Sequence, residues 1–228
     1  MTALFWILMI GLLLIGFVVQ ARLRSKMKEY SQHPTPSGLS GAEIAQKMLS
    51  EYGIHDVQIT SVEGYLTDHY NPTNKTVNLS PEVYHGRSIM AASIAAHECG
   101  HAVQHAQAYS WLTMRSTLVP VVSFSSRWVQ WILLGGILLL NVFPQLLLVG
   151  IVLFGLTTLF SFITLPVEFD ASRRALAWID RSGIMAREDY AMAKDGLKWA
   201  AMTYVVAALS SLATLVYYIM IFMGGRRN

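Results

Sequence analysis

Residues 128–167, WVQWILLGGILLLNVFPQLLLVGIVLFGLTTLFSFITLPV, contain no charged side chain and no histidine. This stretch is interrupted once, by the turn-forming run Asn141-Val142-Phe143-Pro144-Gln145. One bilayer crossing needs about 20 apolar residues, so the stretch is long enough for two crossings joined at that turn. We therefore predict a transmembrane hairpin over residues 116–167, which returns the chain to the side of the membrane that it left.

Two further uncharged runs predict one span each. The first lies within residues 1–20 and the second within residues 199–224. A cleaved signal peptide carries its basic residues before the apolar core, whereas here they follow it, which indicates an uncleaved anchor with its N-terminus outside. These basic residues place the adjoining polar segments in the cytoplasm; they are Arg22, Arg24, Lys26 and Lys28.

Composition supports a membrane protein and argues against a nucleic-acid partner. The chain has 228 residues, of which 54% are hydrophobic and only 14% charged, against about 25% charged in soluble domains. A net charge of +3, gathered beside the apolar runs, is too small for a nucleic-acid surface. The single cysteine, Cys99, excludes an intramolecular disulfide and is best explained as a small buried residue.

The polar part between the first span and the hairpin predicts a small α+β domain. Residues 21–40 are a basic, turn-rich juxtamembrane linker, and the domain is assigned to residues 41–115. Ser40 and Glu43 have the spacing of a capping box at the start of a short helix. Alternating apolar residues and the turn signal Asn71-Pro72-Thr73-Asn74 predict a small sheet between residues 55 and 79.

The run His97-Glu98-Cys99-Gly100-His101 follows a series of strong helix formers and therefore lies on a helix. Residues four apart on a helix share a face, so the two histidines can coordinate one metal ion. Two imidazoles leave a catalytic zinc ion needing one more protein ligand and a water. Glu98 can act on that water, whose pKa zinc lowers toward about 7, as the general base of a metalloprotease.

Glu168 is predicted as the third zinc ligand because the hairpin brings it back to the compartment of the histidine helix. It opens a polar helical segment, residues 168–198, directly after the third span. The alternative for this carboxylate is an ion pair with Arg173 or Arg174 at the membrane surface. The zinc site would then have two histidines and one glutamate around one ion per chain.

The residues that follow His101 on the same helix bear on the kind of metal site. His105 continues the four-residue spacing, but a further helical turn carries it too far along the axis for a zinc bond of about 2.0–2.1 Å. We therefore expect it to support the site through another residue or to lie at the surface. The metzincin pattern needs a glycine three residues after His101 and a third histidine three beyond it. Those positions are Gln104 and Gln107, so that class is excluded.

Three segments resemble the YugP-type bacterial membrane zinc metallopeptidases: residues 68–80, 97–105 and 165–172. The resemblance spans nearly the whole chain. It implies an enzyme of the bacterial plasma membrane that hydrolyses unfolded or membrane proteins. That family is distantly similar to the heat-shock membrane proteases and the CAAX prenyl endopeptidases, where an Asp follows the ligand Glu by four residues. Here Ser172 takes that position, and Asp170 remains a candidate for orienting a metal-bound histidine.

We therefore expect a mainly α integral membrane protein with about four transmembrane helices and a cytosolic zincin-like α+β catalytic domain. The expected activity is that of a zinc-dependent metalloendopeptidase on peptide or protein substrates. The strand at Thr76–Leu79 is predicted to be a sheet edge along which substrate adds as a further strand. The oxyanion of the reaction has several candidate partners, namely His69, Tyr70, Arg173 and Tyr190.

Two rival functions use the same motif. An intramembrane site-2-type protease would take its third ligand from Asp195 in the pair Asp195-Gly196, although Lys194 and Lys198 flank that pair. A non-catalytic zinc-binding membrane scaffold would close all four zinc positions with protein ligands and would need no Glu98. The identity of the third ligand distinguishes the expected endopeptidase from the intramembrane protease. The requirement for Glu98 distinguishes it from the non-catalytic scaffold.

Overall fold

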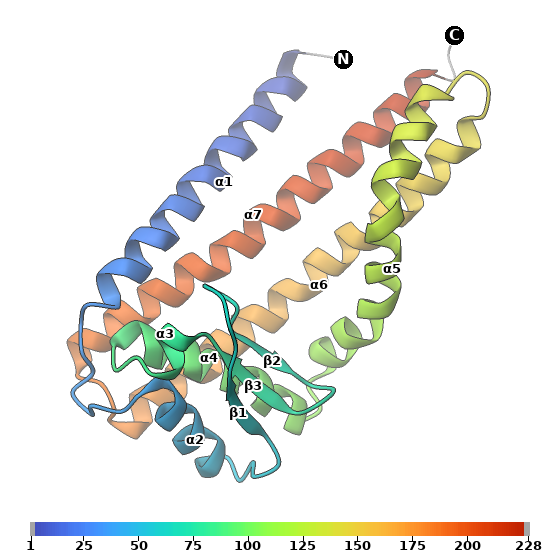
Figure 1. The fold of residues 1–228 in the computed structure, drawn as a ribbon. Coiled ribbons are helices and arrows are strands. Elements are labelled where there is room, and N and C mark those ends of the chain that lie inside the picture. The colour runs from blue at the N-terminus through green and yellow to red at the C-terminus, as the bar shows by residue number, and fades with distance from the viewer. Residues whose placement is uncertain (1–2, 226–228) are drawn as a thin grey trace. The chain divides into compact units, whose positions relative to one another are not determined.

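Four long apolar helices dominate the computed structural model, which describes residues Ala3–Gly225 (Figure 1). They are α1 (Ala3–Tyr30), α5 (Ser110–Leu138), α6 (Pro144–Ser182) and α7 (Arg187–Gly225). Each contains a stretch long and apolar enough to cross a membrane. The number of helices that could span a membrane agrees with the predicted four, and the turn of the predicted hairpin lies between α5 and α6.

The long helices extend beyond the predicted apolar runs. α1 continues to Tyr30, through the first half of the segment predicted as a linker, and α6 passes through Pro166 and Glu168 without a break. The reason is that no cluster of turn-forming residues follows the first apolar run until Pro34. Charged residues after a span therefore continue the helix on the polar side, and Glu168 lies in mid-helix.

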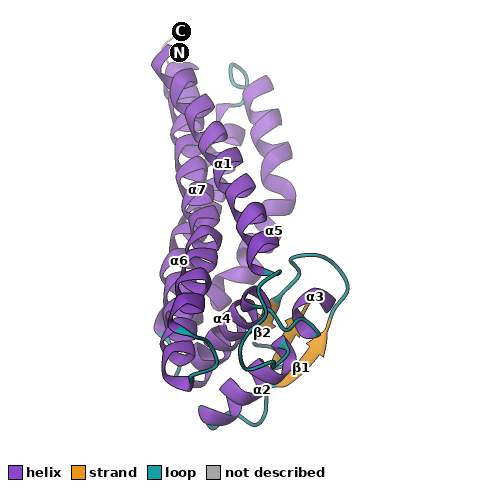
Figure 2. Cartoon of the chain, turned by 90° about the vertical axis from the view of Figure 1, so that its left-hand side faces the viewer, coloured by secondary structure: helices purple, strands orange, loops and turns teal. Residues whose placement is uncertain are grey.

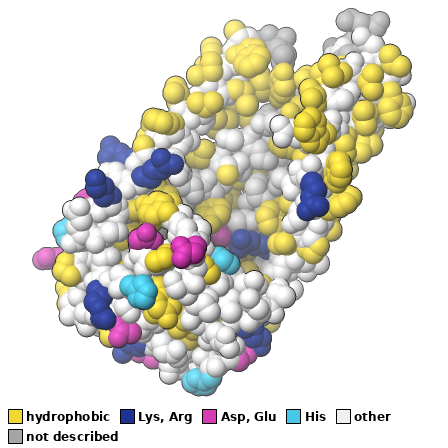
Figure 3. Space-filling model, in the orientation of Figure 1, with side chains coloured by type: hydrophobic (Ala, Val, Ile, Leu, Met, Phe, Trp, Pro, Cys, Tyr) yellow, Lys and Arg dark blue, Asp and Glu magenta, His cyan; other side chains and the backbone are white. Residues whose placement is uncertain are grey.

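The chain divides into two compact units, which are described separately. One unit contains residues up to Phe17, Thr113–Leu165 and residues from Thr203 onward, and the other contains Val18–Leu112 and Pro166–Met202. In the first unit the apolar side chains of α1, α5, α6 and α7 are largely exposed, as lipid-facing positions require. Figure 3 shows these hydrophobic side chains, and the charged residues and histidines gathered on the second unit.

The second unit contains the predicted small sheet (Figure 2). Its strands are β1 (Gln58–Ser61), β2 (His69–Asn71) and β3 (Thr76–Leu79), in the order β1-β3-β2. β3 pairs in parallel with β1 and antiparallel with β2. The prediction that Thr76–Leu79 forms a sheet edge is therefore wrong: all four residues are buried in the central strand. The strands at the edges are β1 and β2.

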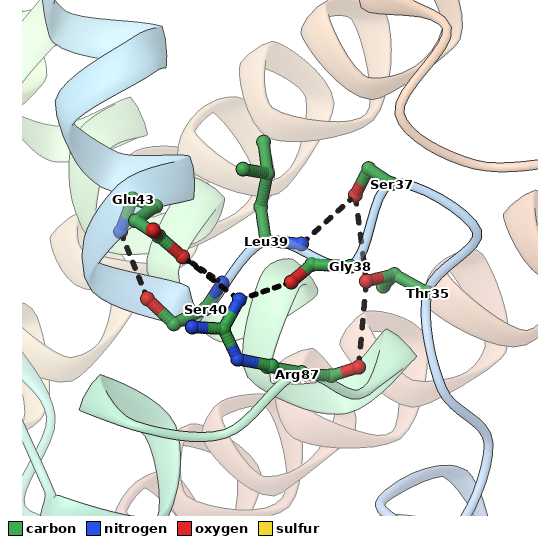
Figure 4. Close-up of polar contacts among 7 residues, drawn as sticks. All are labelled: Thr35, Ser37, Gly38, Leu39, Ser40, Glu43 and Arg87. Atoms are coloured by element: carbon green, nitrogen blue, oxygen red, sulfur yellow. Dashed lines mark hydrogen bonds and ion pairs between the residues drawn. The ribbon is translucent and has the colours of Figure 1, made fainter.

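Three helices surround the sheet in this unit: α2 (Gly41–Glu51), α3 (Pro81–Tyr84) and α4 (Ile89–Ala106). The predicted capping box is confirmed, because the Ser40 side chain accepts from the Glu43 backbone and Glu43 accepts from the Ser40 backbone (Figure 4). Arg87 also pairs with Glu43 and fixes the start of α2. The core joins α2, β3 and α4 to the polar half of α6; its largest fully buried side chains include Ile44, Met48, Leu79, Val103 and Trp178.

Candidate metal centre

Two helices meet at the candidate centre, the histidine-bearing α4 and the polar half of α6. The contact is very close at Gly100, where an added Cβ would lie 2.6 Å from the carbonyl oxygen of Ala171. Any side chain at position 100 would therefore push the two backbones apart. The glycine of the motif makes room for the backbone of α6, and so brings Glu168 to the face of α4 that carries the histidines.

His97, His101 and Glu168 present their ligand atoms to one another. The Glu168 Oε2 atom lies 3.3 Å from His97 Nε2 and 3.8 Å from His101 Nε2, and the three ligand atoms lie within 4.8 Å of one another. Two ligands of a tetrahedral zinc ion, each at 2.0–2.1 Å, are separated by about 3.4 Å. The two separations measured from Glu168, 3.3 and 3.8 Å, are therefore compatible with a zinc ion held by these two nitrogens and one oxygen.

Glu98 is the buried carboxyl group next to the first histidine. Its residue is 8% exposed, and burial raises its pKa to about 7, against the lowering effect of His97 and of a hydrogen bond from the Tyr70 backbone. A carboxyl group whose pKa lies near neutrality is well matched to proton transfer. It is not among the three residues whose ligand atoms converge.

The second ring nitrogen of each histidine has a hydrogen-bonding partner. His97 Nδ1 lies 3.1 Å from the Ser172 hydroxyl, and His101 Nδ1 lies 3.0 Å from Gln104 Oε1. Such partners orient the rings of metal-binding histidines. Ser172 thus contacts the ring of His97, a role that its position in the sequence did not indicate.

Asp170 lies beside this network but does not touch either histidine ring directly. Gln104 is fully buried and donates from Nε2 to Asp170 Oδ2 and to the Val167 carbonyl, both at 2.9 Å. Asp170 also accepts from Arg173 and Arg174. The suggestion that Asp170 orients a histidine therefore needs an intermediary, Gln104. The sequence signal available for Gln104 was its position three residues after His101, on the same helical face.

The other residues singled out in the sequence lie outside the three-ligand group. His105 Nδ1 is 2.7 Å from the Tyr70 hydroxyl, and His69 Nδ1 is 2.7 Å from the Thr67 carbonyl. Burial raises the pKa of Tyr70 to about 12, so its hydroxyl is protonated. Tyr190 packs against the core, and the Arg173 side chain is largely exposed. The Cys99 thiol is buried and faces the Ala45 carbonyl.

Asp195, the ligand required by the intramembrane alternative, is engaged elsewhere. Its Oδ2 atom accepts from the Tyr30 hydroxyl at 2.8 Å and lies 3.7 Å from Lys26 Nζ. It therefore ties the start of α7 to the end of α1. Among the described residues, the carboxylate that joins the two histidines is that of Glu168.

Comparison with known proteins decides the family. The family model described as "Putative neutral zinc metallopeptidase" matches residues 5–223. The chain belongs to this zinc metallopeptidase family. It is 44% identical over 223 residues, 98% of each chain, to the protein named "Putative membrane protease YugP" of Bacillus subtilis (strain 168). No solved structure matches it. The family relationship implies zinc, and the four apolar helices agree with a membrane location.

We predict that Glu168→Ala loses zinc, because it leaves two histidines as the only protein ligands. Loss of even the partners of ligands commonly costs about 10–100-fold in metal affinity, so at least that loss is expected. Asp195→Ala, the matched control, should bind zinc within about threefold of the native protein. Both are measured by zinc titration of the purified full chain against a chelating dye. Zinc lost with Asp195 and kept without Glu168 would establish the intramembrane alternative instead.

Proposed function

We propose that this chain is a metalloendopeptidase that hydrolyses peptide bonds at the His97–His101–Glu168 centre with Glu98 as general base. The observation that carries the proposal is the convergence of three ligand atoms beside a buried carboxyl group that is not one of them. A scaffold with a structural zinc site would use four protein ligands and would need no such group. One zinc ion per chain is proposed from the single cluster among the described residues.

Each residue of the centre has a separate role in the proposed peptide hydrolysis. A zinc ion held there would supply Lewis acidity, polarising the scissile carbonyl and acidifying the attacking water. Glu98 accepts the proton of that water and then delivers it to the leaving amine. Glu98 is buried next to the three ligand residues without being one of them, a position from which a carboxyl group can take up and release one proton in each cycle. Tyr70 and His105, which are hydrogen-bonded to each other, are candidates to contact the oxyanion from the sheet side.

The free edge of β2 is proposed as the place where the substrate backbone binds. β2 pairs with β3 on one side only. The Tyr70 backbone hydrogen-bonds to Glu98, so its N–H points away from β3. In a strand the N–H and C=O of one residue point the same way, so the Tyr70 carbonyl also faces the free edge. An extended peptide can donate to it and lie across α4 next to Glu98.

The membrane arrangement proposed is that of a bacterial plasma-membrane protein whose second unit, a zincin-like α+β domain, faces the cytoplasm. Four basic residues follow the first span within its own helix, at positions 22, 24, 26 and 28, and such residues favour the cytoplasmic side. The hairpin of α5 and α6 then returns Glu168 to the side of α4. Unfolded or membrane proteins are the proposed substrates, since the matched relative is named as a membrane protease.

Glu98→Gln should keep about one zinc ion per chain and lose peptide hydrolysis by roughly 10²–10⁴-fold, because the amide cannot accept the proton of water. Zinc content and cleavage of an unfolded protein substrate are measured on the same preparation. A Glu98→Gln protein that cleaves at the native rate would eliminate Glu98 as the base. Loss of zinc in this variant would instead make Glu98 a ligand.

The orientation is tested by cysteine labelling in whole cells, with Cys99 replaced by serine. A cysteine at Asn74, in the turn between β2 and β3, should resist an impermeant thiol reagent, whereas one at Asn141, in the hairpin turn, should react. Asn74 lies in the polar unit and Asn141 at the opposite end of a span. The reverse labelling pattern would show that the second unit faces outward.

A further inference from the structure

A large cavity in the second unit lies close to the candidate centre without including its ligands. Its volume is about 1440 Å³, above the roughly 300–1,000 Å³ of small-molecule pockets. The end of α1, the loop before β2, α3 and the first two turns of α4 enclose it. We refer to it as the α1–α4 cavity; the residues that matter below are Arg24, Met27, Lys28, Asp68, Met90 and Ile94.

The cavity adjoins the candidate centre along two elements. Ile94 and Met90 precede His97 by three and seven residues on α4, which places them about 4.5 and 10.5 Å from it along the helix axis. Asp68, another lining residue, precedes Tyr70 of β2 by two positions. An extended chain advances about 3.3 Å per residue. A peptide leaving the centre on this side would therefore enter the cavity within about one to three residues of the cleaved bond.

The free charge in the cavity is mostly positive. Arg87 is held by Glu43 and the Gly38 carbonyl (Figure 4), and Asp68 accepts from Ser80. Arg24 and Lys28 are exposed and make no hydrogen bond or ion pair with any residue in the described part of the chain. Among the carboxylates that line the cavity, Glu82 is the one that is likewise exposed and makes no such contact with the described residues. The two cations are four residues apart on one helix face, where like charges repel.

We propose that the α1–α4 cavity selects the substrate. It accepts an extended peptide segment in which an acidic side chain meets Arg24 and Lys28. Large apolar side chains of the same segment pack on Met27, Met90 and Ile94. This inference rests on the proposed peptidase function and adds a substrate class to it: segments with acidic and apolar residues one to three positions from the cleaved bond, on one side of it.

The test is a charge reversal, using zinc-loaded full chain in micelles of a neutral detergent. A peptide library varies the three positions on each side of the cleaved bond among Glu, Gln and Lys. The native protein should prefer Glu over Lys roughly three- to tenfold at one or more of these positions, as expected for two partly exposed ion pairs. Arg24→Glu/Lys28→Glu should prefer Lys. Arg22→Glu, an exposed charge change on the same helix outside the cavity, should keep the native preference.

The outcomes separate this inference from the proposed function. If the native chain cleaves no peptide, both fail. If it cleaves and the double variant keeps the preference for Glu, the cavity proposal is overturned while the peptidase function stands. The native rate could instead be independent of peptide charge and rise when vesicles with anionic lipid are added, with the rise lost in the Arg24→Glu/Lys28→Glu variant. That result would make the cavity a lipid-headgroup site and would also overturn the proposal that it selects peptides.

A second inference concerns Gln104 and rests on hydrogen-bond polarity. The Val167 carbonyl and the Asp170 carboxylate, both 2.9 Å from Gln104 Nε2, can only accept hydrogen bonds. The amide nitrogen must therefore face them, and Oε1 must face His101 Nδ1. An oxygen there requires hydrogen on Nδ1, which leaves the Nε2 lone pair free for metal. The Ser172 hydroxyl at His97 can donate or accept, so it does not select a tautomer.

We infer that Gln104 is a positioning residue, which holds His101 in the tautomer that binds metal. Gln104→Met should weaken zinc binding roughly 10–100-fold, whereas Ser172→Ala, which removes the partner of the other histidine, should weaken it less. The double variant Gln104→Glu/Asp170→Asn keeps an oxygen at His101 Nδ1 and restores a donor between positions 104 and 170, so it should recover most of the affinity. Zinc affinity is measured by chelator competition, and the thermal midpoint of the metal-free proteins controls for folding. A Gln104→Met protein that binds zinc within twofold of native, or a larger loss in Ser172→Ala, would refute this role.

Discussion

The close approach of α4 and α6 at Gly100 is the constraint on which the candidate centre depends. A Cβ atom at position 100 would lie 2.6 Å from the Ala171 carbonyl oxygen, so a side chain of any size there would force the helices apart. The separation matters because Glu168, which precedes Ala171 by less than one turn of α6, reaches both histidines of α4 only across this contact. A displacement of even about 1 Å exceeds the tolerance of a metal site, whose distances hold within about 0.2 Å. The contact at Gly100 therefore sets how the polar half of α6 packs against α4.

Around this contact the buried polar groups satisfy one another. Gln104 is fully buried and links His101 to Asp170, and Asp170 is itself held by Arg174, whose side chain also donates to Gln107. Buried polar networks stabilise one arrangement when every member has a partner, and are costly when one is missing. Among the described residues, none of the buried side-chain polar atoms lacks a partner. The cost of assembling a polar centre beside a membrane-spanning segment is thus offset by hydrogen bonds within the second unit.

The sequence was sufficient for features set by local spacing. The hairpin follows from an uncharged run of the right length, the capping box from Ser40 and Glu43, and the joint orientation of His97 and His101 from helix geometry. The approach of Glu168 to the histidines could be predicted because the hairpin returns the chain, and its carboxylate lies 3.3 and 3.8 Å from the two rings. The strand order could not be predicted, since β1 pairs with β3, and β2 lies between these two strands in the chain. Ser172 was missed as the partner of His97 because that hydrogen bond joins residues 75 positions apart. Gln104 lies only three residues after His101, but its bonds to Asp170 and Val167 join residues 66 and 63 positions apart, on helices whose register depends on the Gly100 contact.

The central claim, a zinc ion held by two imidazoles and one carboxylate, is tested most directly by X-ray absorption at the zinc edge of the purified full chain. The account predicts one zinc ion with four ligands, nitrogen or oxygen atoms at about 2.0–2.2 Å, with the outer-shell scattering of two imidazole rings. Cys99, whose thiol is fully buried against the Ala45 carbonyl, should contribute no sulfur. A zinc–sulfur distance of about 2.3 Å, or scattering from fewer than two imidazoles, would contradict the centre described above.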